Sequence, residues 1–352
     1  EILRTIGSAY VPPVDPAGMT TYLHQNLGQT LVPAFLPPAK RFEVQFGARG
    51  SELAYGGDID ATVTITNRGT EPLVVTENGL FAGRIRVDAR VGGDIQREIP
   101  NLVVETIRTS LTVPPGRSLS TSVRLSRGVL RRILLDYPQA NLEIQFTLYL
   151  DPVTTAEGLI RNAIADLEPV TIVVRRPKVD VTAAYVRNRV DSLSSEQEAQ
   201  KVRTSQLFTG LLREQHAMAQ HGPLYPYRYA AWLPDLLRSA LLKDPGLLLS
   251  QDERDWAVKV NATADILSMP LDQELTAAAG RNLHHVQWPV RLMTAYLLGT
   301  TQGSDFDRVL DWMAGSDGSD LVRAMAAALK EGRKPKLSLG SGWSPGTLLP
   351  AR

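Results

Sequence analysis

Residues 142–150 read Leu-Glu-Ile-Gln-Phe-Thr-Leu-Tyr-Leu, with an apolar side chain at every second position. Because successive side chains of a strand point to opposite faces, this alternation predicts a strand with one face on a core and the other in water, as in antiparallel sheets. The same period returns in 42–46 and 59–65, and further strands are expected at 73–75, 85–89, 95–99, 103–107, 111–113, 119–125 and 169–174. Turns rich in Gly and Pro separate these segments, so residues 41–178 are predicted to form an antiparallel β-sandwich.

Two segments between the expected strands have a helical rather than a strand period. Residues 128–135 and 155–166 are therefore predicted to be helical inserts in the sheet region.

The turns between the first strands carry a resemblance. Gly57-Asp58, then Asn67-Arg68-Gly69, and later Val113-Pro114-Pro115-Gly116, are similar to the turns that introduce and end strands in bacterial immunoglobulin-like domains. The resemblance implies an immunoglobulin-like sandwich of the cysteine-free bacterial kind. It implies no activity, since turn chemistry specifies a fold and not a site.

The period changes to a helical one after Arg175-Arg176-Pro177-Lys178, which we interpret as a linker. Residues 179–333 are predicted to form an all-α domain, separable from the sandwich near residues 176–182. The segment 183–220 holds one or two helices, and Pro226 is expected to open the next one at its first turn. Further helices are predicted at 251–268, 271–281, 286–299, 304–314 and 318–331.

An internal repeat lies in the helical region. Val290-Arg-Leu-Met-Thr-Ala-Tyr-Leu297 aligns with Val322-Arg-Ala-Met-Ala-Ala-Ala-Leu329 at an offset of 32 residues, and Val258-Lys-Val260 is a fainter third copy. The pattern resembles the second helix of a HEAT repeat, which implies a solenoid of helix pairs. An irregular helical bundle remains the alternative.

The two ends of the chain differ from the central regions. Residues 1–40 are predicted to be an extended strap with a short helix near 19–27, and residues 334–352, rich in Gly, Pro and Ser, to be a flexible tail.

Composition excludes several classes of function. The 38 basic and 37 acidic side chains nearly cancel, so no global field attracts nucleic acid, and no nucleic-acid partner is expected. No run of about 20 apolar residues is present, so membrane insertion is not expected. The absence of cysteine excludes disulfides, thiolate nucleophiles and cysteine metal sites.

No catalytic or metal-binding constellation is predicted. Gly342-Trp-Ser-Pro-Gly346 matches the nucleophile elbow of hydrolases in letters only, because Pro345 has no N–H for an oxyanion hole. His216 and His221 are five residues apart, which is unsuited to a shared metal, and His285 is expected beneath Trp288. Asp305 and Asp320 are interpreted as helix caps or first-turn acids. We therefore predict no enzyme activity and no cofactor.

The densest aromatic stretch supplies the candidate binding residues. These are Tyr225, Tyr227, Arg228, Tyr229 and Trp232. Exposed Tyr and Trp beside Arg are typical of binding hot spots, whereas the alternative is that they pack inside the helical domain or against the sandwich.

The expected function is therefore non-catalytic. We predict a structural or protein-interaction protein, with a protein partner or self-association, in a bacterial envelope or secreted assembly. Two alternatives stay open: a cytoplasmic helical-repeat adaptor that binds a peptide or helix, and accessory domains of an enzyme whose catalytic part lies elsewhere.

Overall fold

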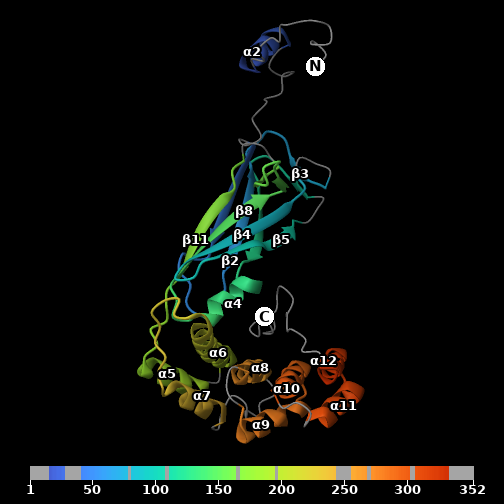
Figure 1. The fold of residues 1–352 in the computed structure, drawn as a ribbon. Helices are drawn as coiled ribbons and strands as arrows, with labels where there is room; N and C mark the ends of the chain where they lie inside the picture. Colours follow the sequence, from blue (N-terminus) through green and yellow to red (C-terminus); the bar gives the residue numbers. More distant parts are fainter. Residues whose placement is uncertain are drawn as a thin grey trace.

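The computed structural model describes residues 16–27, 41–77, 81–107, 111–163, 167–194, 197–242, 255–267, 271–301 and 306–332. Antiparallel sheets occupy the N-terminal half of the chain and helices the C-terminal half, as the change of period predicts (Figure 1). Helix α2 (Pro16–Leu27) precedes the sheets, close to where the sequence predicts a short helix.

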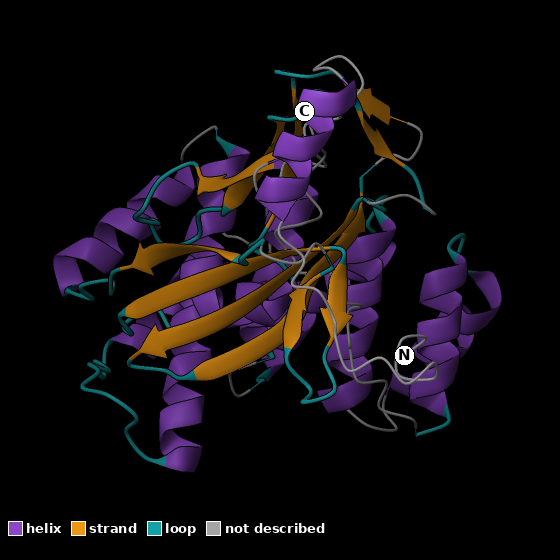
Figure 2. Ribbon diagram, turned by 90° about the horizontal axis from the view of Figure 1, so that it is seen from above, coloured by secondary structure: helices purple, strands orange, loops and turns teal. Residues whose placement is uncertain are grey.

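Two antiparallel sheets make up most of the first half, called here the sheet domain (residues 41–178). One has the order β1-β2-β7 and the other β11-β8-β4-β5. The strands are β1 (Phe42–Ala48), β2 (Asp60–Asn67), β4 (Arg84–Gly93), β5 (Arg97–Thr106), β7 (Ser118–Arg124), β8 (Leu142–Leu150) and β11 (Val170–Arg176). Figure 2 shows the long strands of the larger sheet side by side, with the helices beyond them.

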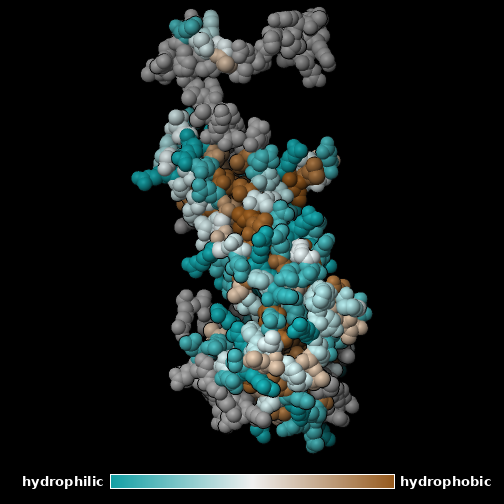
Figure 3. Space-filling view, turned by 90° about the vertical axis from the view of Figure 1, so that its left-hand side faces the viewer, coloured by the Kyte–Doolittle hydropathy of each residue, from teal (hydrophilic) through white to brown (hydrophobic). Residues whose placement is uncertain are grey.

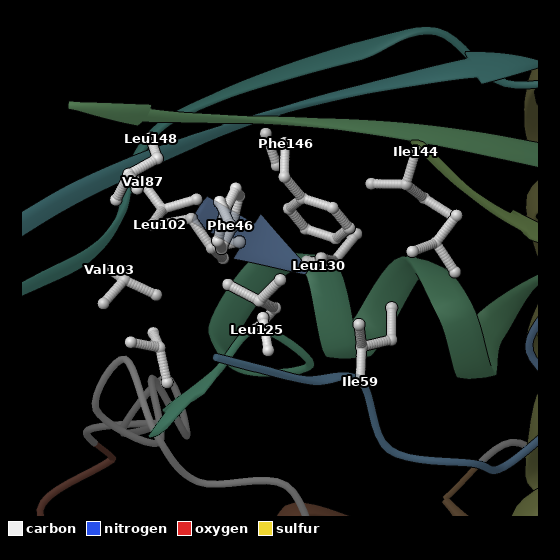
Figure 4. Close-up of a cluster of buried hydrophobic side chains, with 14 of the residues drawn as sticks. Phe46, Ile59, Val87, Leu102, Val103, Leu125, Leu130, Ile144, Phe146 and Leu148 are labelled. Atoms are coloured by element: carbon white, nitrogen blue, oxygen red, sulfur yellow. The ribbon is translucent and has the colours of Figure 1, made fainter. Parts of the chain in front are cut away.

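The apolar faces of the two sheets meet in one core. In β8 the residues Leu142, Ile144, Phe146 and Leu148 are all buried, and the intervening Glu143 and Gln145 are exposed, so the period-two prediction is confirmed. Figure 4 shows Phe146 from this sheet above Phe46 and Leu125 of the other layer. Helix α4 (Gly128–Asp136), also predicted, closes one end of the core through Leu130.

The prediction of a helix at 155–166 is wrong. The described part of this segment belongs to a hairpin of β9 (Pro152–Thr154) and β10 (Ile160–Asn162), one of two short ribbons beside the sheets. Gly158 turns the chain at φ +80°, which only glycine adopts without strain, and Asn162 accepts a hydrogen bond from Leu150 N. The second ribbon pairs β3 (Leu73–Val75) with β6 (Leu111–Val113).

The helices of the second half form two rows, called here the helical domain (residues 179–332). An inner row contains α6 (Glu198–His221), α8 (Trp256–Ile266), α10 (Trp288–Thr301) and α12 (Asp320–Lys330), and each contacts the next. An outer row contains α5 (Ala183–Asp191), α7 (Leu233–Leu242), α9 (Gln273–Gly280) and α11 (Asp307–Ser316) (Figure 1). Short 3₁₀ turns η1 (Ser192–Ser194) and η3 (Arg281–His284) follow α5 and α9.

The inner row explains the 32-residue repeat. Val258, Val290 and Val322 occupy equivalent places in α8, α10 and α12, and all are buried. Within the repeated stretches, Ala295 and Met293 are buried, whereas the equivalent Ala327 and Met325 of the last helix are half-buried. The final helix has no further described helix beside it, which leaves that side open.

Candidate functional site

The two domains meet in a buried polar network around Glu214 of α6. Its Oε1 accepts hydrogen bonds from Gln139 N (2.8 Å) and from the Tyr225 hydroxyl (2.5 Å), and its Oε2 accepts one from Gln139 Nε2 (2.8 Å). Burial raises the pKa of Glu214, and the hydrogen bonds from Tyr225 and Gln139 oppose that rise. The network thus joins a loop of the sheet domain to α6 through groups that are all satisfied.

Arg176, in the segment interpreted as a linker, belongs to the same junction. Its side chain is only 1% exposed and donates to the carbonyls of Tyr137 (2.6 Å) and Pro138 (2.8 Å). Val179 N also donates to Pro138 O. Arg176 is therefore fixed in place, whereas Arg175, Pro177 and Lys178 are exposed, and the interpretation of this segment as a linker stays a prediction.

Close backbone contact completes the junction. Tyr55 of the sheet domain donates its hydroxyl to Leu135 O (2.7 Å) and to Gln206 O of α6 (3.0 Å). A Cβ on Gly210 would lie 2.2 Å from Leu135 O, so only glycine allows α6 to approach this far. Met218 and Tyr225 belong to the core of the sheets although they follow it in sequence, so the domains share buried surface.

The aromatic stretch singled out in the sequence lies at this junction. Tyr225 is buried, which removes it from any exposed partner surface, and Tyr227 packs against the sheet core. Tyr229 and Trp232 pack half-buried against the helical core, and Arg228 is exposed. This placement matches the alternative of internal packing for the aromatic members, and partner contacts of the stretch stay a prediction.

The segment after Pro226 is not helical, contrary to prediction. Gln139 Oε1 accepts from Arg228 N (2.8 Å) and Gln139 Nε2 donates to Arg228 O (3.0 Å). The side-chain amide thus holds the Arg228 backbone as a neighbouring strand would. The backbone N–H and C=O of Arg228 therefore do not take part in helical hydrogen bonds, and α7 begins only at Leu233.

A second candidate site lies where the pair α9 and α10 meets the pair α11 and α12. Arg291 of α10 forms a two-pronged ion pair with Asp317, with Nε–Oδ2 at 2.8 Å and Nη2–Oδ1 at 2.7 Å. Its Nη1 also donates to the carbonyls of His285 and Val286. One side chain therefore fixes the turn before α10 against the turn before α12.

Large apolar side chains are exposed around these fixed turns. We define the rim as the five residues His284, Val286, Trp288, Trp312 and Leu321. Val286 is 65% exposed, Trp312 47% and Leu321 57%, with Trp288 at 36%. The ring of His284 lies 5.5 Å from that of Trp312, which belongs to the neighbouring helix pair. The expected placement of His285 beneath Trp288 stays a prediction. Exposed aromatic and aliphatic side chains of this kind suit a protein contact.

The hydropathy of the surface differs between the sheet domain and the helical domain. On the face shown in Figure 3, the larger strongly hydrophobic areas lie over the sheet domain, and smaller ones lie among hydrophilic and intermediate residues of the helical domain. Tryptophan ranks as intermediate because its large ring carries a polar N–H, and this amphipathic character is what makes it frequent at protein interfaces.

Asp265 of α8 is a buried carboxylate inside the helical domain. Ser205 Oγ donates to its Oδ2 (2.9 Å), and Oδ1 has no hydrogen-bond partner. Burial raises the pKa of Asp265 well above its usual value, with smaller opposing effects from Ser205 and Arg213. The group is enclosed by packed helices, so it affects stability and has no access to a substrate.

Other possible chemical sites offer little. Within the described ranges, no group of three or more His, Asp or Glu residues is placed to hold a metal ion. Among the helices of the described chain, none has the length and apolar character needed to cross a membrane. A cavity of about 310 Å³ beside β11 contains Arg175 and Glu143, which pair with each other at 3.0 Å. Ser344 lies outside the described residues.

The sequence does not single out the rim. Trp288 stands two residues before the repeated Val290, but Trp256 stands at the same place before Val258 and packs half-buried against the helical core. Trp312 has no distinguishing mark in the sequence either. Its exposure follows from the packing of α11 against α12.

Comparisons with known proteins assign neither a family nor an activity. No family model matches the sequence, and no curated protein matches it. Among solved structures, a β-glucosidase from Listeria innocua in complex with gluconolactone is similar at 14% identity and a TM-score of 0.24, over 40% of this chain and 16% of that one. The chain thus spans about a sixth of the length of the β-glucosidases it matches.

Two smaller structures are similar at the same low level. The CARDB domain of PF1109 from Pyrococcus furiosus has 12% identity and a TM-score of 0.20, over 39% of this chain and 94% of that domain. Spo0M, a sporulation control protein from Bacillus subtilis, has 13% identity and a TM-score of 0.19, over 44% of this chain and 56% of that one. Likeness this slight carries no functional conclusion.

Proposed function

We propose that this chain is a non-catalytic protein-interaction protein that docks a partner through the rim. The exposure of two tryptophans, a valine and a leucine on the last two helix pairs is the observation that carries the proposal. A folded protein gains nothing by leaving large apolar groups in water, so a cluster of them on rigid backbone is best explained by a surface that is covered in a complex.

We further infer the finer identity of the two domains. The order β1-β2-β7 packed on β11-β8-β4-β5 supports an immunoglobulin-like sandwich. The buried Val258, Val290 and Val322 in adjacent inner helices support a short HEAT-like repeat. On the domain type alone, we propose a bacterial envelope or secreted assembly as the setting.

The junction supports a role as a rigid holder. Gln139 of the sheet domain is buried and hydrogen-bonded across the domain boundary to Glu214 and to the Arg228 backbone, and Tyr55 donates across it to Gln206 O. A partner held at the rim would therefore keep a defined position relative to the sheet domain, which is what an assembly component needs and a flexible tether does not supply.

Site-specific photocrosslinking tests the proposal. A benzophenone amino acid is placed at position 312, or at the control position Val104, which is 63% exposed on β5, in cells that make the protein naturally. We expect a discrete adduct at 312 that is absent at 104 and that disappears when Trp288→Ala is added. An adduct of twice the chain's mass would identify the partner as a second copy.

The proposal fails if positions 312 and 104 give the same adducts, or none. Thermal melting of Trp288→Ala separates lost binding from lost folding, since a half-exposed side chain at a helix start contributes little to the core.

A further inference from the structure

Two arginines beside the rim have no ion pair among the described residues. In the last two helix pairs, Arg291, Arg323 and Lys330 are paired with Asp317, Asp320 and Asp311. Arg281 and Arg308 are exposed, and no carboxylate of the described chain pairs with either. The region therefore neutralises its other arginines and leaves positive charge at one place.

Each arginine lies one helical turn from a member of the His284–Trp312 pair. Arg281 and His284 are three apart in the 3₁₀ turn η3, where residues i and i+3 eclipse each other. Arg308 and Trp312 are four apart in α11 and so share a face. Since His284 contacts Trp312, the two arginines flank one aromatic pair.

The two acidic residues of α11, Asp307 and Asp311, act on Lys330 of α12. Asp311 pairs with it, and the charge of Asp307 helps to raise the pKa of Lys330. The positive charge beside the rim is thus not cancelled by the helix that carries it.

We propose that the rim binds a protein segment in which carboxylates stand next to a large apolar side chain. This inference rests on the proposed function and specifies the chemistry of the partner. The apolar anchor would cover Trp288, Trp312 and Val286, while the carboxylates would pair with Arg281 and Arg308, whose planar guanidinium groups match carboxylates in two-pronged contacts.

The chain's own C-terminal segment does not have this chemistry. Residues 333–352 contain Arg333, Lys334, Lys336 and Arg352 and no Asp or Glu. Like charge would oppose its binding beside Arg281 and Arg308, so the charge pattern favours a separate acidic partner.

Selection from a random-sequence peptide library displayed on phage tests the inference even while the partner is unidentified. The full chain is immobilised as wild type, as Trp288→Ala/Trp312→Ala, as Arg281→Gln/Arg308→Gln and as the control Arg90→Gln. Arg90 is an exposed arginine on β4, far from the rim in the fold. Selected peptides are then measured by fluorescence anisotropy at two salt concentrations.

We expect wild type and Arg90→Gln to enrich peptides that carry Asp or Glu beside an aromatic or aliphatic residue. The double arginine variant should bind these peptides about fivefold more weakly, as two exposed ion pairs predict, and added salt should have the same effect. The double tryptophan variant should not bind them.

Other results would overturn the inference in distinguishable ways. Peptides that need the tryptophans but are not enriched in acids would refute the acidic partner and leave the proposed function standing. A lack of any enrichment over the double tryptophan variant would refute the inference, and photocrosslinking at 312 would then decide the proposed function separately. A synthetic peptide of residues 333–352 that competes with the acidic peptides would identify the tail as the occupant instead.

Discussion

Replacing Gly210 by alanine provides a sharp test of the domain junction, because local and tertiary effects have opposite signs. Gly210 lies inside α6, where alanine is more favourable than glycine by about 1 kcal/mol. From helix propensity alone, Gly210→Ala should therefore stabilise the protein.

The surroundings of Gly210 predict the reverse. The new Cβ would lie 2.2 Å from Leu135 O, 2.5 Å from the Tyr55 hydroxyl and 2.9 Å from Pro138 Cγ. Helix α6 would have to retreat by roughly 1 Å to reach ordinary contact distances. Overpacking of this kind costs about 1–3 kcal/mol, and strain in the hydrogen bonding of the single Tyr55 hydroxyl about 1 kcal/mol more. We expect a net loss of about 2 kcal/mol.

The matched control is Gly315→Ala in α11. A Cβ at this exposed glycine would meet nothing within 4 Å, so only the propensity effect remains and stability should rise by up to about 1 kcal/mol. Urea unfolding of wild type and both variants, followed by far-ultraviolet circular dichroism, gives the free energies of unfolding. If Gly210→Ala is as stable as Gly315→Ala, the close approach of α6 to the sheet domain is wrong.

Three further predictions concern the buried polar groups and the junction. Asp265→Asn should be more stable than wild type at about pH 7. Burial raises the pKa of Asp265 in the folded state above its unfolded value of about 3.9. The contribution of Asp265 to stability is therefore full below about pH 3.9 and is lost as the pH rises. Urea titrations should show the difference shrinking toward about pH 4, and a constant difference would contradict this. Arg291→Met should lose about 3 kcal/mol by leaving buried Asp317 uncompensated, whereas the exposed Arg281→Met should change stability by less than about 0.5 kcal/mol in the same assay; equal losses would refute the role of the ion pair. A fragment of residues 41–178 should unfold at a lower urea concentration than the full chain, which should show one transition, because the fragment lacks the α6 side chains that cover its core; a fragment as stable as the full chain would restore independent domains.

Several features of the fold were predictable from the sequence because they depend on local periodicity. The alternation in 142–150 identifies β8 and its buried face, since a strand turns successive side chains to opposite sides. The 32-residue offset between Val290 and Val322 identifies helices in equivalent positions, since repeated packing needs repeated residues. The helix expected at 155–166 failed because Gly158 provides a turn that periodicity does not report.

The candidate site could not be read from the sequence, because exposure is decided by segments far away in the chain. Tyr225 follows Leu224 and Trp312 precedes Met313, so their neighbours in the sequence do not distinguish them. Tyr225 is buried because it packs in the core of the sheets and donates a hydrogen bond to Glu214. Trp312 is exposed because α11 packs against the core through its opposite face. The sequence alone determined most of the strands and helices, because their periods are local. Only the tertiary structure decided which aromatic side chains close the junction and which remain at the surface, since burial depends on what the rest of the chain brings against each one.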